Sequence, residues 1–230
     1  FDAAFVDFEH GGVSWAALAG ITRACDLWGM ASVVRVNRLD PAQVLRTLDQ
    51  GASAVMAPHI VTVEDAELLA KSCRYPPHGI RGVAGGRRQY GVADYFKRAD
   101  EEVMAIALIE DYEAVRNIRS LLRVDGIDVF YVAPSDLAAS MGHTGDPGHP
   151  DVQAAIAGAI KAISGAGRVA GTLVNDSNVD RFLDMGVRCA GVPWMNWVAS
   201  GAAPFLNKVN GRKKGPAPAS SSRGRPAGRK

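Results

Sequence analysis

Two acidic side chains, Glu110 and Asp136, follow apolar runs that are one strand–helix–strand step apart in the sequence. Parallel strands joined in this way end at the same edge of a sheet, so both carboxylates are expected at one mouth. Carboxylate oxygens with open positions beside them suit Mg²⁺ or Mn²⁺, which keep water ligands and accept substrate oxygens. Alternatively, each acid caps the helix after it, where it also suits the helix dipole. The spacing alone favours neither interpretation.

Charged groups at other predicted strand ends favour a reaction centre. Arg35 follows the apolar residues of SVVRV, where a guanidinium needs an anionic partner, either a structural acid or negative charge on a bound oxygen. His10 is a candidate general base, because imidazole titrates near neutral pH and Asp7 can orient it. Strand alternation places Asp7 and His10 on opposite faces, so this pairing requires the chain to turn at Gly11. The alternative for His10 is a hydrogen-bonded polar group without a catalytic task.

Several common kinds of site find no support in the sequence. It contains no G-x-S-x-G, no phosphate-binding P-loop and no dinucleotide fingerprint with an acid at the right distance. The other histidines form no H-x-x-H or H-E-x-x-H pattern, so zinc is not expected. No window has the length and apolar character of a membrane span. The three cysteines are odd in number and far apart, so we expect reduced thiols and a cytoplasmic location.

The elements that must position these side chains alternate along the chain. Short apolar runs predict seven strands, and helical periodicity fills the segments between them. Such apolar strands alternating with helices predict a parallel α/β sheet covered on its outside. We expect a (β/α)₈ TIM barrel that lacks its first strand and helix, with an open doubly wound sheet as the alternative. The predicted strands lie near residues 4–9, 32–36, 54–59, 104–110, 128–133, 169–174 and 189–193.

The chain is expected to form one domain over residues 1–210, followed by a tail. Residues 212–230 carry seven Lys or Arg and no acid, so the rest of the chain is net acidic although the whole carries +2. The tail has no apolar period and is expected to be disordered. Contact between this tail and nucleic acid is the weaker alternative to a solvated tail. The glycine-rich segment 79–91 is long for a connection and is expected to be functional or mobile.

A resemblance adds to this interpretation. With DFEHG, VVRVNRLDPAQVLRTLDQGA, RYPPHGIRGV, LIED and VAPSDLAASMG in this order, the chain resembles the metal-dependent class II pyruvate aldolases. These are the 4-hydroxy-2-oxo-acid and 2-dehydro-3-deoxy-sugar-acid aldolases, which are related to the citrate lyase beta chain. The resemblance covers roughly residues 1–205 and implies a TIM barrel of the phosphoenolpyruvate/pyruvate type. It also implies reversible cleavage of a 4-hydroxy-2-oxo acid to pyruvate and an aldehyde.

The resemblance also implies roles for particular residues. Glu110 and Asp136 would hold the divalent ion, Mg²⁺ or Mn²⁺ with Co²⁺ as a further candidate, and His10 would accept the proton. Arg35 would stabilise the transition state and contact substrate. The pattern L-L-D-x-G matches LRTLDQG, so Asp49 would raise the basicity of a histidine. Because Asp49 ends a helix that should face the far side of its own barrel, we expect it to meet a histidine of another subunit.

Substrate contacts are expected at Ser135 and Asp136, where backbone N–H groups would receive the substrate carboxylate. Many similar proteins have Gln two residues before the metal-binding Glu, whereas this chain has Leu108, which indicates a different or less polar substrate contact. His59 stands where many have an apolar residue, and it would shape the pocket.

Two other functions remain open at this point. A lyase of the citrate lyase beta type would cleave an acyl-CoA thioester with a similar carboxylate pair. A non-catalytic barrel scaffold would use its basic tail for nucleic acid. The resemblance implies that the apolar segment 196–209 docks on a neighbouring copy, as in similar proteins, and that the protein is a homo-oligomer, either a trimer or a hexamer.

Overall fold

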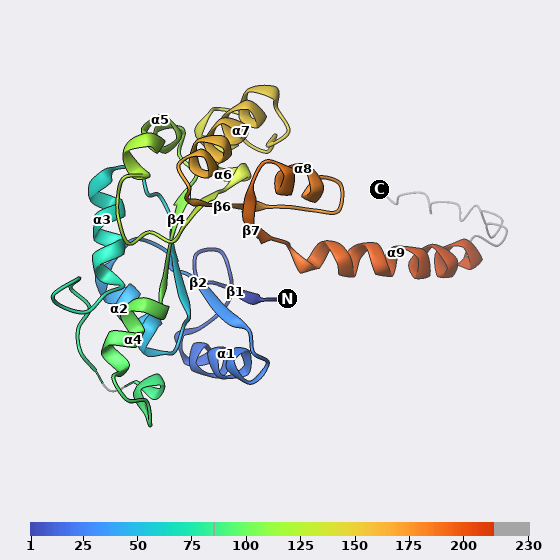
Figure 1. The fold of residues 1–230 in the computed structure, drawn as a ribbon. Helices are drawn as coiled ribbons and strands as arrows, with labels where there is room; N and C mark the ends of the chain where they lie inside the picture. Colours follow the sequence, from blue (N-terminus) through green and yellow to red (C-terminus); the bar gives the residue numbers. More distant parts are fainter. Residues whose placement is uncertain (85, 214–230) are drawn as a thin grey trace, which may run out of the picture. The chain divides into compact units, whose positions relative to one another are not determined.

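The protein contains a parallel sheet of seven strands, each followed by one or more helices (Figure 1). The computed structural model describes residues 1–84 and 86–213. All seven predicted strands are present, which confirms the parallel α/β prediction, although most end a residue or two before the polar group that was expected to close them. The strands are β1 (Ala3–Asp7), β2 (Ala31–Arg35), β3 (Ala54–Ala57), β4 (Met104–Ile109), β5 (Val129–Val132), β6 (Val169–Leu173) and β7 (Val187–Gly191).

The helices begin where the sequence places capping residues. Asp40 accepts a hydrogen bond from the Ala42 N–H, and Pro41 occupies the first helical position. Thr62 and Asp65 form a reciprocal capping box. The helices are α1 (Trp15–Leu27), α2 (Pro41–Asp49), α3 (Val63–Ser72), α4 (Tyr95–Glu102), α5 (Tyr112–Leu121), α6 (Pro134–Ser140), α7 (Pro150–Gly165), α8 (Val179–Asp184) and α9 (Trp194–Lys213), with a 3₁₀ turn η1 at Arg87–Gln89.

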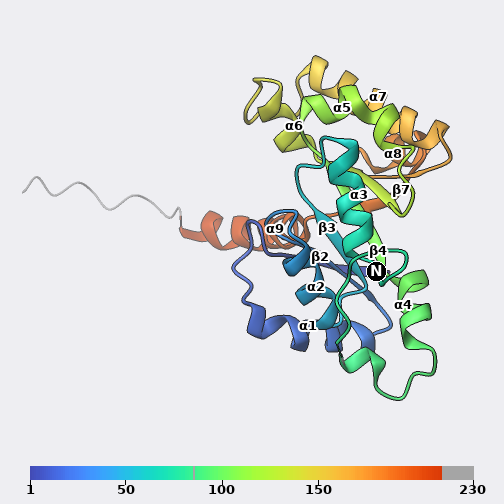
Figure 2. The ribbon, with the colours of Figure 1, turned by 90° about the vertical axis from the view of Figure 1, so that its left-hand side faces the viewer.

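The strands follow one another across the sheet in sequence order, from β1 to β7. A doubly wound sheet reverses its strand order at a switch point, so the doubly wound alternative is wrong. Figures 1 and 2 show a curved sheet with its helices on the outer side. Within the described residues, β1 and β7 are the two edges of this sheet.

On the inner face of the sheet, apolar side chains are followed by charged ones toward the carboxyl ends of the strands. Inward side chains from β2 to β5 form one buried cluster, and alternation along each strand sends the other side chains to the helices. For two strands, a charged residue lies two positions after an inner apolar residue: Arg35 follows Val33, and Glu110 follows Leu108. The buried inner cluster consists of Val33, Ala54, Met56, Ile106, Leu108, Val129, Tyr131 and Ala133.

The chain divides into a compact unit, Phe1–Gly191, and a second unit that starts at Val192 and contains α9. From residue 214 onward, the predicted basic tail lies outside the described residues. None of the helices in the described part of the chain combines the length and the apolar character needed to cross a membrane.

Candidate active site

The charged residues predicted from strand ends gather at the edge of the sheet where the strands finish. Asp7 ends β1 and Arg35 ends β2, and the two residues are direct partners in the parallel register. Glu110 follows β4 directly, and Asp136 lies in the first turn of α6, just after β5. The common polarity of parallel strands therefore brings these four residues to one mouth, as the sequence predicted.

Arg35 is held by two carboxylates. Its Nε and Nη2 donate to Asp7 Oδ1 at 2.9 Å and Oδ2 at 2.7 Å, a bidentate pair, and its Nη1 lies 2.9 Å from Glu9 Oε2. Burial raises the pKa of Asp7, but hydrogen bonds from Arg35 and from the backbone of Glu9 outweigh it, so the pKa lies below its usual value. Two carboxylates therefore hold the Arg35 guanidinium in a fixed orientation at the mouth.

The predicted pairing of Asp7 with the His10 ring is not what the structure shows. Both oxygens of Asp7 face Arg35, and Asp7 reaches His10 only through the backbone N–H, at 3.4 Å. The nearest carboxylate to the ring is Glu9, with Oε2 at 3.9 Å from Nε2, and the His10 side chain is 65% exposed. The chain does turn here as expected: a Cβ at Gly11 would collide with the Asp7 carbonyl oxygen.

Glu110 is the buried acid of the site, at 2% exposure. Its Oε1 accepts a hydrogen bond from the His59 N–H at 2.8 Å, so the alternative that Glu110 caps α5 is wrong; Asp111 occupies the N-cap position. Burial raises the pKa of Glu110 to about 7, and the charges of Glu9 and Asp136 add to this effect against the opposing influence of His59.

His59 takes part in this cluster through an unusual backbone conformation. Its φ of 54° lies in the left-handed region, which directs its N–H to Glu110. The ring Nδ1 lies 3.0 Å from Asp111 Oδ2 and 3.5 Å from Glu110 Oε1. The hydrogen bond with Asp111 raises the pKa of His59, with burial opposing it.

The residues at the mouth fit a hard divalent cation. Among the described residues, Glu9, His59 and Glu110 offer donor atoms that all lie within 4.8 Å of one another. Glu9 Oε2 is buried and accepts no hydrogen bond, although it lies beside Arg35. A largely buried carboxylate oxygen whose partner is the Arg35 guanidinium, next to a second buried carboxylate, is a set of oxygen ligands that suits Mg²⁺ or Mn²⁺.

Of these three possible metal ligands, the sequence predicted only Glu110. Glu9 lies two residues after Asp7 on the same face of the strand, so strand alternation could have indicated it as a ligand. The part played by His59 depends on its positive φ, for which the sequence carries no clear signal. Asp136 does not belong to the three-residue group, but its charge contributes to the raised pKa of Glu110.

The predicted substrate contacts occupy different depths. Ser135 and Asp136 stand in the first turn of α6, where backbone N–H groups have no partner within the helix. Leu108 is 2% exposed and belongs to the buried inner cluster. Leu108 lies two residues before Glu110, which is equally buried, and its contact with a substrate stays a prediction.

Asp49 lies elsewhere in its own chain. It is the last residue of α2, and its Oδ1 accepts a hydrogen bond from Arg81 Nη2 at 3.1 Å; the Arg81 side chain is 1% exposed. Two arginines of the predicted segment 79–91 also form ion pairs: Arg87 and Arg88 both contact Asp26 of α1. The expectation that Asp49 does not meet its own His10 therefore agrees with the pairing seen here.

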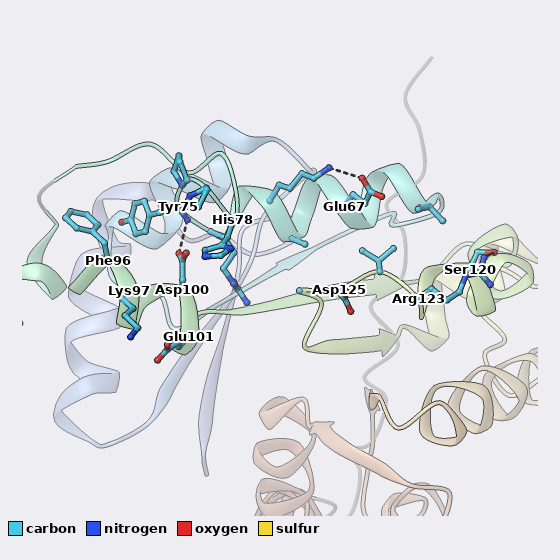
Figure 3. Close-up of a pocket in the computed structure, with 18 residues that line it drawn as sticks. Glu67, Tyr75, His78, Phe96, Lys97, Asp100, Glu101, Ser120, Arg123 and Asp125 are labelled. Atoms are coloured by element: carbon cyan, nitrogen blue, oxygen red, sulfur yellow. Dashed lines mark hydrogen bonds and ion pairs between the residues drawn. The ribbon is translucent and has the colours of Figure 1, made fainter. Parts of the chain in front are cut away.

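A cavity of about 1010 Å³ contains none of the charged residues of this mouth (Figure 3). It is lined by one side of α3, by α4, by residues 74–78 and by the end of α5 with the residues after it. Its charged residues have both signs and several are already paired: Lys71 with Glu67 at 2.8 Å, and Asp100 with the Tyr75 N–H at 2.8 Å. Several lining residues, such as Lys71 and Arg123, lie at or just after the ends of α3 and α5, and this part of the cavity is therefore remote from the mouth.

Comparisons with known proteins agree with this geometry. A family model described as HpcH/HpaI aldolase/citrate lyase matches residues 1–192. The chain is 37% identical over 227 residues to a hydroxypyruvate/pyruvate aldolase of Pseudomonas aeruginosa, covering 96% of this chain and 84% of that protein. It is 38% identical over 191 residues to a 4-hydroxy-2-oxo-heptane-1,7-dioate aldolase of Klebsiella pneumoniae, covering 81% and 72%.

A solved structure is similar over most of its length. The crystal structure of a HpcH/HpaI aldolase/citrate lyase family protein from Burkholderia cenocepacia superposes with a TM-score of 0.85 at 32% identity, covering 91% of this chain and 86% of that one. The family match spans the whole sheet and the mouth described above. This chain belongs to the HpcH/HpaI aldolase/citrate lyase family.

Proposed function

We propose that this protein is a divalent-metal-dependent aldolase that cleaves a 4-hydroxy-2-oxo acid to pyruvate and an aldehyde, and that also catalyses the reverse addition. The observation that carries the proposal is the buried Glu110, with donor atoms of Glu9 and His59 within 4.8 Å and the fixed cation Arg35 beside Glu9. The relatives at 37% and 38% identity are named as aldolases, which supports the same reaction class.

Glu110 and Asp136 would hold the ion, with Glu9 as a further oxygen ligand. When bound, Mg²⁺, Mn²⁺ or Co²⁺ supplies Lewis-acid polarisation of the keto group of the 2-oxo acid. Arg35 presents its guanidinium to negative charge on the same substrate oxygen. The N–H groups of Ser135 and Asp136, in the first turn of α6, would receive the substrate carboxylate.

His10 is proposed as the base that removes the proton from the C4 hydroxyl during cleavage. Its ring is largely exposed and reaches only Glu9 within the chain, at 3.9 Å. We propose that Asp49 of a neighbouring copy orients the ring, because Asp49 in its own chain is paired with Arg81 on α2. Such an arrangement would make the active site depend on assembly.

Replacing His10 by Gln is expected to lower kcat about 10²-fold, which is the lower end of the range for general acid–base catalysis. Gln keeps a polar side chain at an exposed position, so the melting temperature should stay unchanged. Steady-state kinetics with the metal-loaded protein measure the effect, and His78→Gln at an exposed site serves as the matched control. Full activity in the His10 variant would remove His10 from the reaction.

The affinity for Mn²⁺ is expected to fall about tenfold for each pH unit below 7. Burial raises the pKa of Glu110 to about 7, and a proton on this carboxylate competes with the ion. Calorimetric titrations with Mn²⁺ on both sides of that pH measure the dependence. Glu110→Gln should bind weakly and lose this pH dependence. An affinity in the unmodified chain that stays constant below pH 7 would contradict the prediction.

The assembly is proposed to be a homo-oligomer, a trimer or a hexamer, of cytoplasmic protein. Helix α9 carries a series of exposed apolar side chains, and exposed apolar patches of this kind mark interaction surfaces. The three cysteines are free thiols, as expected for a reducing compartment. The exposed apolar side chains of α9 are Trp194, Met195, Trp197, Val198, Phe205 and Leu206.

The fold is proposed to be a TIM barrel in which a further strand and helix fill the gap between β7 and β1. The sequential strand order and the curved sheet support this proposal. The catalytic domain is proposed to span residues 1–210.

The experiment that tests the function is a lactate-dehydrogenase-coupled assay of pyruvate release from a panel of 4-hydroxy-2-oxo acids, with and without EDTA. We expect release that EDTA abolishes and that Mn²⁺ or Mg²⁺ restores. Equal rates with and without EDTA would contradict a metal-dependent reaction, and no release from any member of the panel would contradict the aldolase.

A second candidate function is favoured by the description of the family model, which includes citrate lyase. A lyase of that type would act on an acyl-CoA thioester at the same mouth. Cleavage of such a thioester, together with no pyruvate release in the coupled assay, would favour this second candidate.

A further inference from the structure

We propose that His143, His149 and Asp151 form a second metal site, which takes a divalent ion that prefers imidazole, such as Zn²⁺. Donor atoms of these three side chains all lie within 4.8 Å of one another. They stand on the connection between α6 and α7 and at the first turn of α7. The group shares no residue with the cluster of Glu9, His59 and Glu110, so it is independent of the proposed aldolase centre.

The backbone of this connection already places both imidazoles side by side. The N–H of His143 donates to the Ala138 carbonyl at 2.8 Å, and the N–H of His149 donates to the Asp146 carbonyl at 3.2 Å. The two rings stack with centroids 3.6 Å apart and planes 15° from parallel. The fold thus brings the two imidazoles together before any ion binds, which lowers the entropic cost of the site, although the His143 ring has still to rotate.

An ion at His149 Nδ1 would replace only a long hydrogen bond. His149 is the N-cap of α7, and its Nδ1 accepts a hydrogen bond of 3.3 Å from the Asp151 N–H. The same Nδ1 lies 3.8 Å from Asp151 Oδ2, a gap that one shared cation can bridge. His143 must turn out of the stack to coordinate, and neither ring is fully buried, so this rotation meets little resistance.

The helix dipole opposes a cation at this end of α7, but the effect is small. A unit charge at the first turn of a helix changes an equilibrium by about two- to fivefold. The Asp151 carboxylate faces the position of the ion and supplies the opposite charge. Two imidazoles and a carboxylate form a ligand set that late first-row ions bind far more tightly than a single dipole opposes.

An ion held here would keep a position open to solvent. His143 and Asp151 line a cavity of about 610 Å³ between α5 and α7, together with Tyr112 and Arg116. Because two of the three protein ligands line this cavity, water or a small anionic ligand can reach the fourth position of zinc. The residues are too unevenly spaced for a short zinc motif, which is why the sequence did not indicate this site.

The test is a Co²⁺ titration of the full chain in excess Mg²⁺, followed by visible absorption, with Zn²⁺ added as competitor. Excess Mg²⁺ fills oxygen-rich sites, whereas the imidazole pair retains its preference for Co²⁺ and Zn²⁺. We expect one equivalent of Co²⁺ with a nitrogen-ligated spectrum that Zn²⁺ displaces. His143→Ala should weaken this binding at least about tenfold.

His149→Asn separates ligation from folding, because Asn is also a good N-cap and preserves the start of α7. It should lose the site as His143→Ala does, while circular dichroism and Mg²⁺-dependent pyruvate release stay unchanged in both variants. His78→Ala controls for the loss of any exposed histidine, and Glu110→Gln should retain the site. Equal Co²⁺ affinity and stoichiometry in the unmodified chain and in His143→Ala would overturn the proposal, whatever the outcome of the aldolase assay.

Discussion

Glu110→Gln is expected to lower kcat/KM for pyruvate release by about 10³-fold or more and, at the same time, to stabilise the metal-free protein. The catalytic loss follows because removing one ionic ligand withdraws several kcal/mol of electrostatic stabilisation at the reacting oxygen. Gln is close to isosteric and can still accept the 2.8 Å hydrogen bond from the His59 N–H. The fold should therefore survive the change.

The gain in stability depends on pH, and its sign follows from the raised pKa of Glu110. The unfolded carboxyl loses its proton near pH 4.5, whereas burial keeps the folded one protonated up to about pH 7. The free energy of unfolding of the unmodified chain therefore falls as pH rises through this window. The advantage of the Gln variant should grow from nothing below pH 4.5 to about 3 kcal/mol above pH 7.

Chemical denaturation in EDTA across this window measures the difference, and the coupled assay with Mn²⁺ measures the activity. Glu113→Gln is the matched control, because Glu113 lies on the neighbouring helix α5, is exposed, and pairs only with Arg116. A Gln variant that is less stable than the unmodified chain above pH 7 would show that Glu110 is not held in the buried, unfavourable state described here.

Arg35→Met is expected to reduce both stability and activity. The guanidinium side chain is 12% exposed and neutralises Asp7 and Glu9, so its removal leaves two partly buried carboxylates close together. We expect the free energy of unfolding at neutral pH to fall by about 3 kcal/mol. Loss of a cation directed at the substrate oxygen should lower kcat by about 10² to 10³.

The double variant Arg35→Met/Asp7→Asn separates the two roles. Removing the unpaired charge of Asp7 should restore much of the stability, whereas activity should stay as low as in Arg35→Met. Arg38→Met is the matched control, because Arg38 is 72% exposed and its ion pair with Asp40, on the surface, should contribute little to stability. Recovery of activity along with stability would assign Arg35 a structural role alone.

The sequence predicted the fold well, because the signals are local and agree with one another. The seven apolar runs correspond to seven strands, and Asp40 with Pro41 forms a local signal for the start of α2. The boundaries differed where a strand ended in polar residues: β3 stops at Ala57 because His59 leaves the extended conformation. β7 begins at Val187, before the predicted start, because pairing with β6 defines it rather than its own apolar pattern.

The sequence predicted where the charged side chains gather, but not which of them pair with one another. Strand polarity alone brings Arg35, Glu110 and Asp136 to one mouth, and this required only the order of elements. Which carboxylate holds Arg35 depends on register and on the turn at Gly11, so the pairing of Asp7 with Arg35 was missed. Sequence distance does not report depth within the inner face, so it did not indicate that Leu108 belongs to the buried inner cluster.

The ion pair between Asp7 and Arg35 also ties the chemistry of the mouth to the assembly of the sheet. The two residues are direct neighbours across β1 and β2, which are joined only through the crossover helix α1. A slip of one residue would turn Arg35 to the outer face and leave Asp7 facing an apolar side chain. The counter-ion that directs the guanidinium therefore also fixes the alignment of two strands, and variants made to alter catalysis here should be examined for misaligned, aggregation-prone chains as well as for lost turnover.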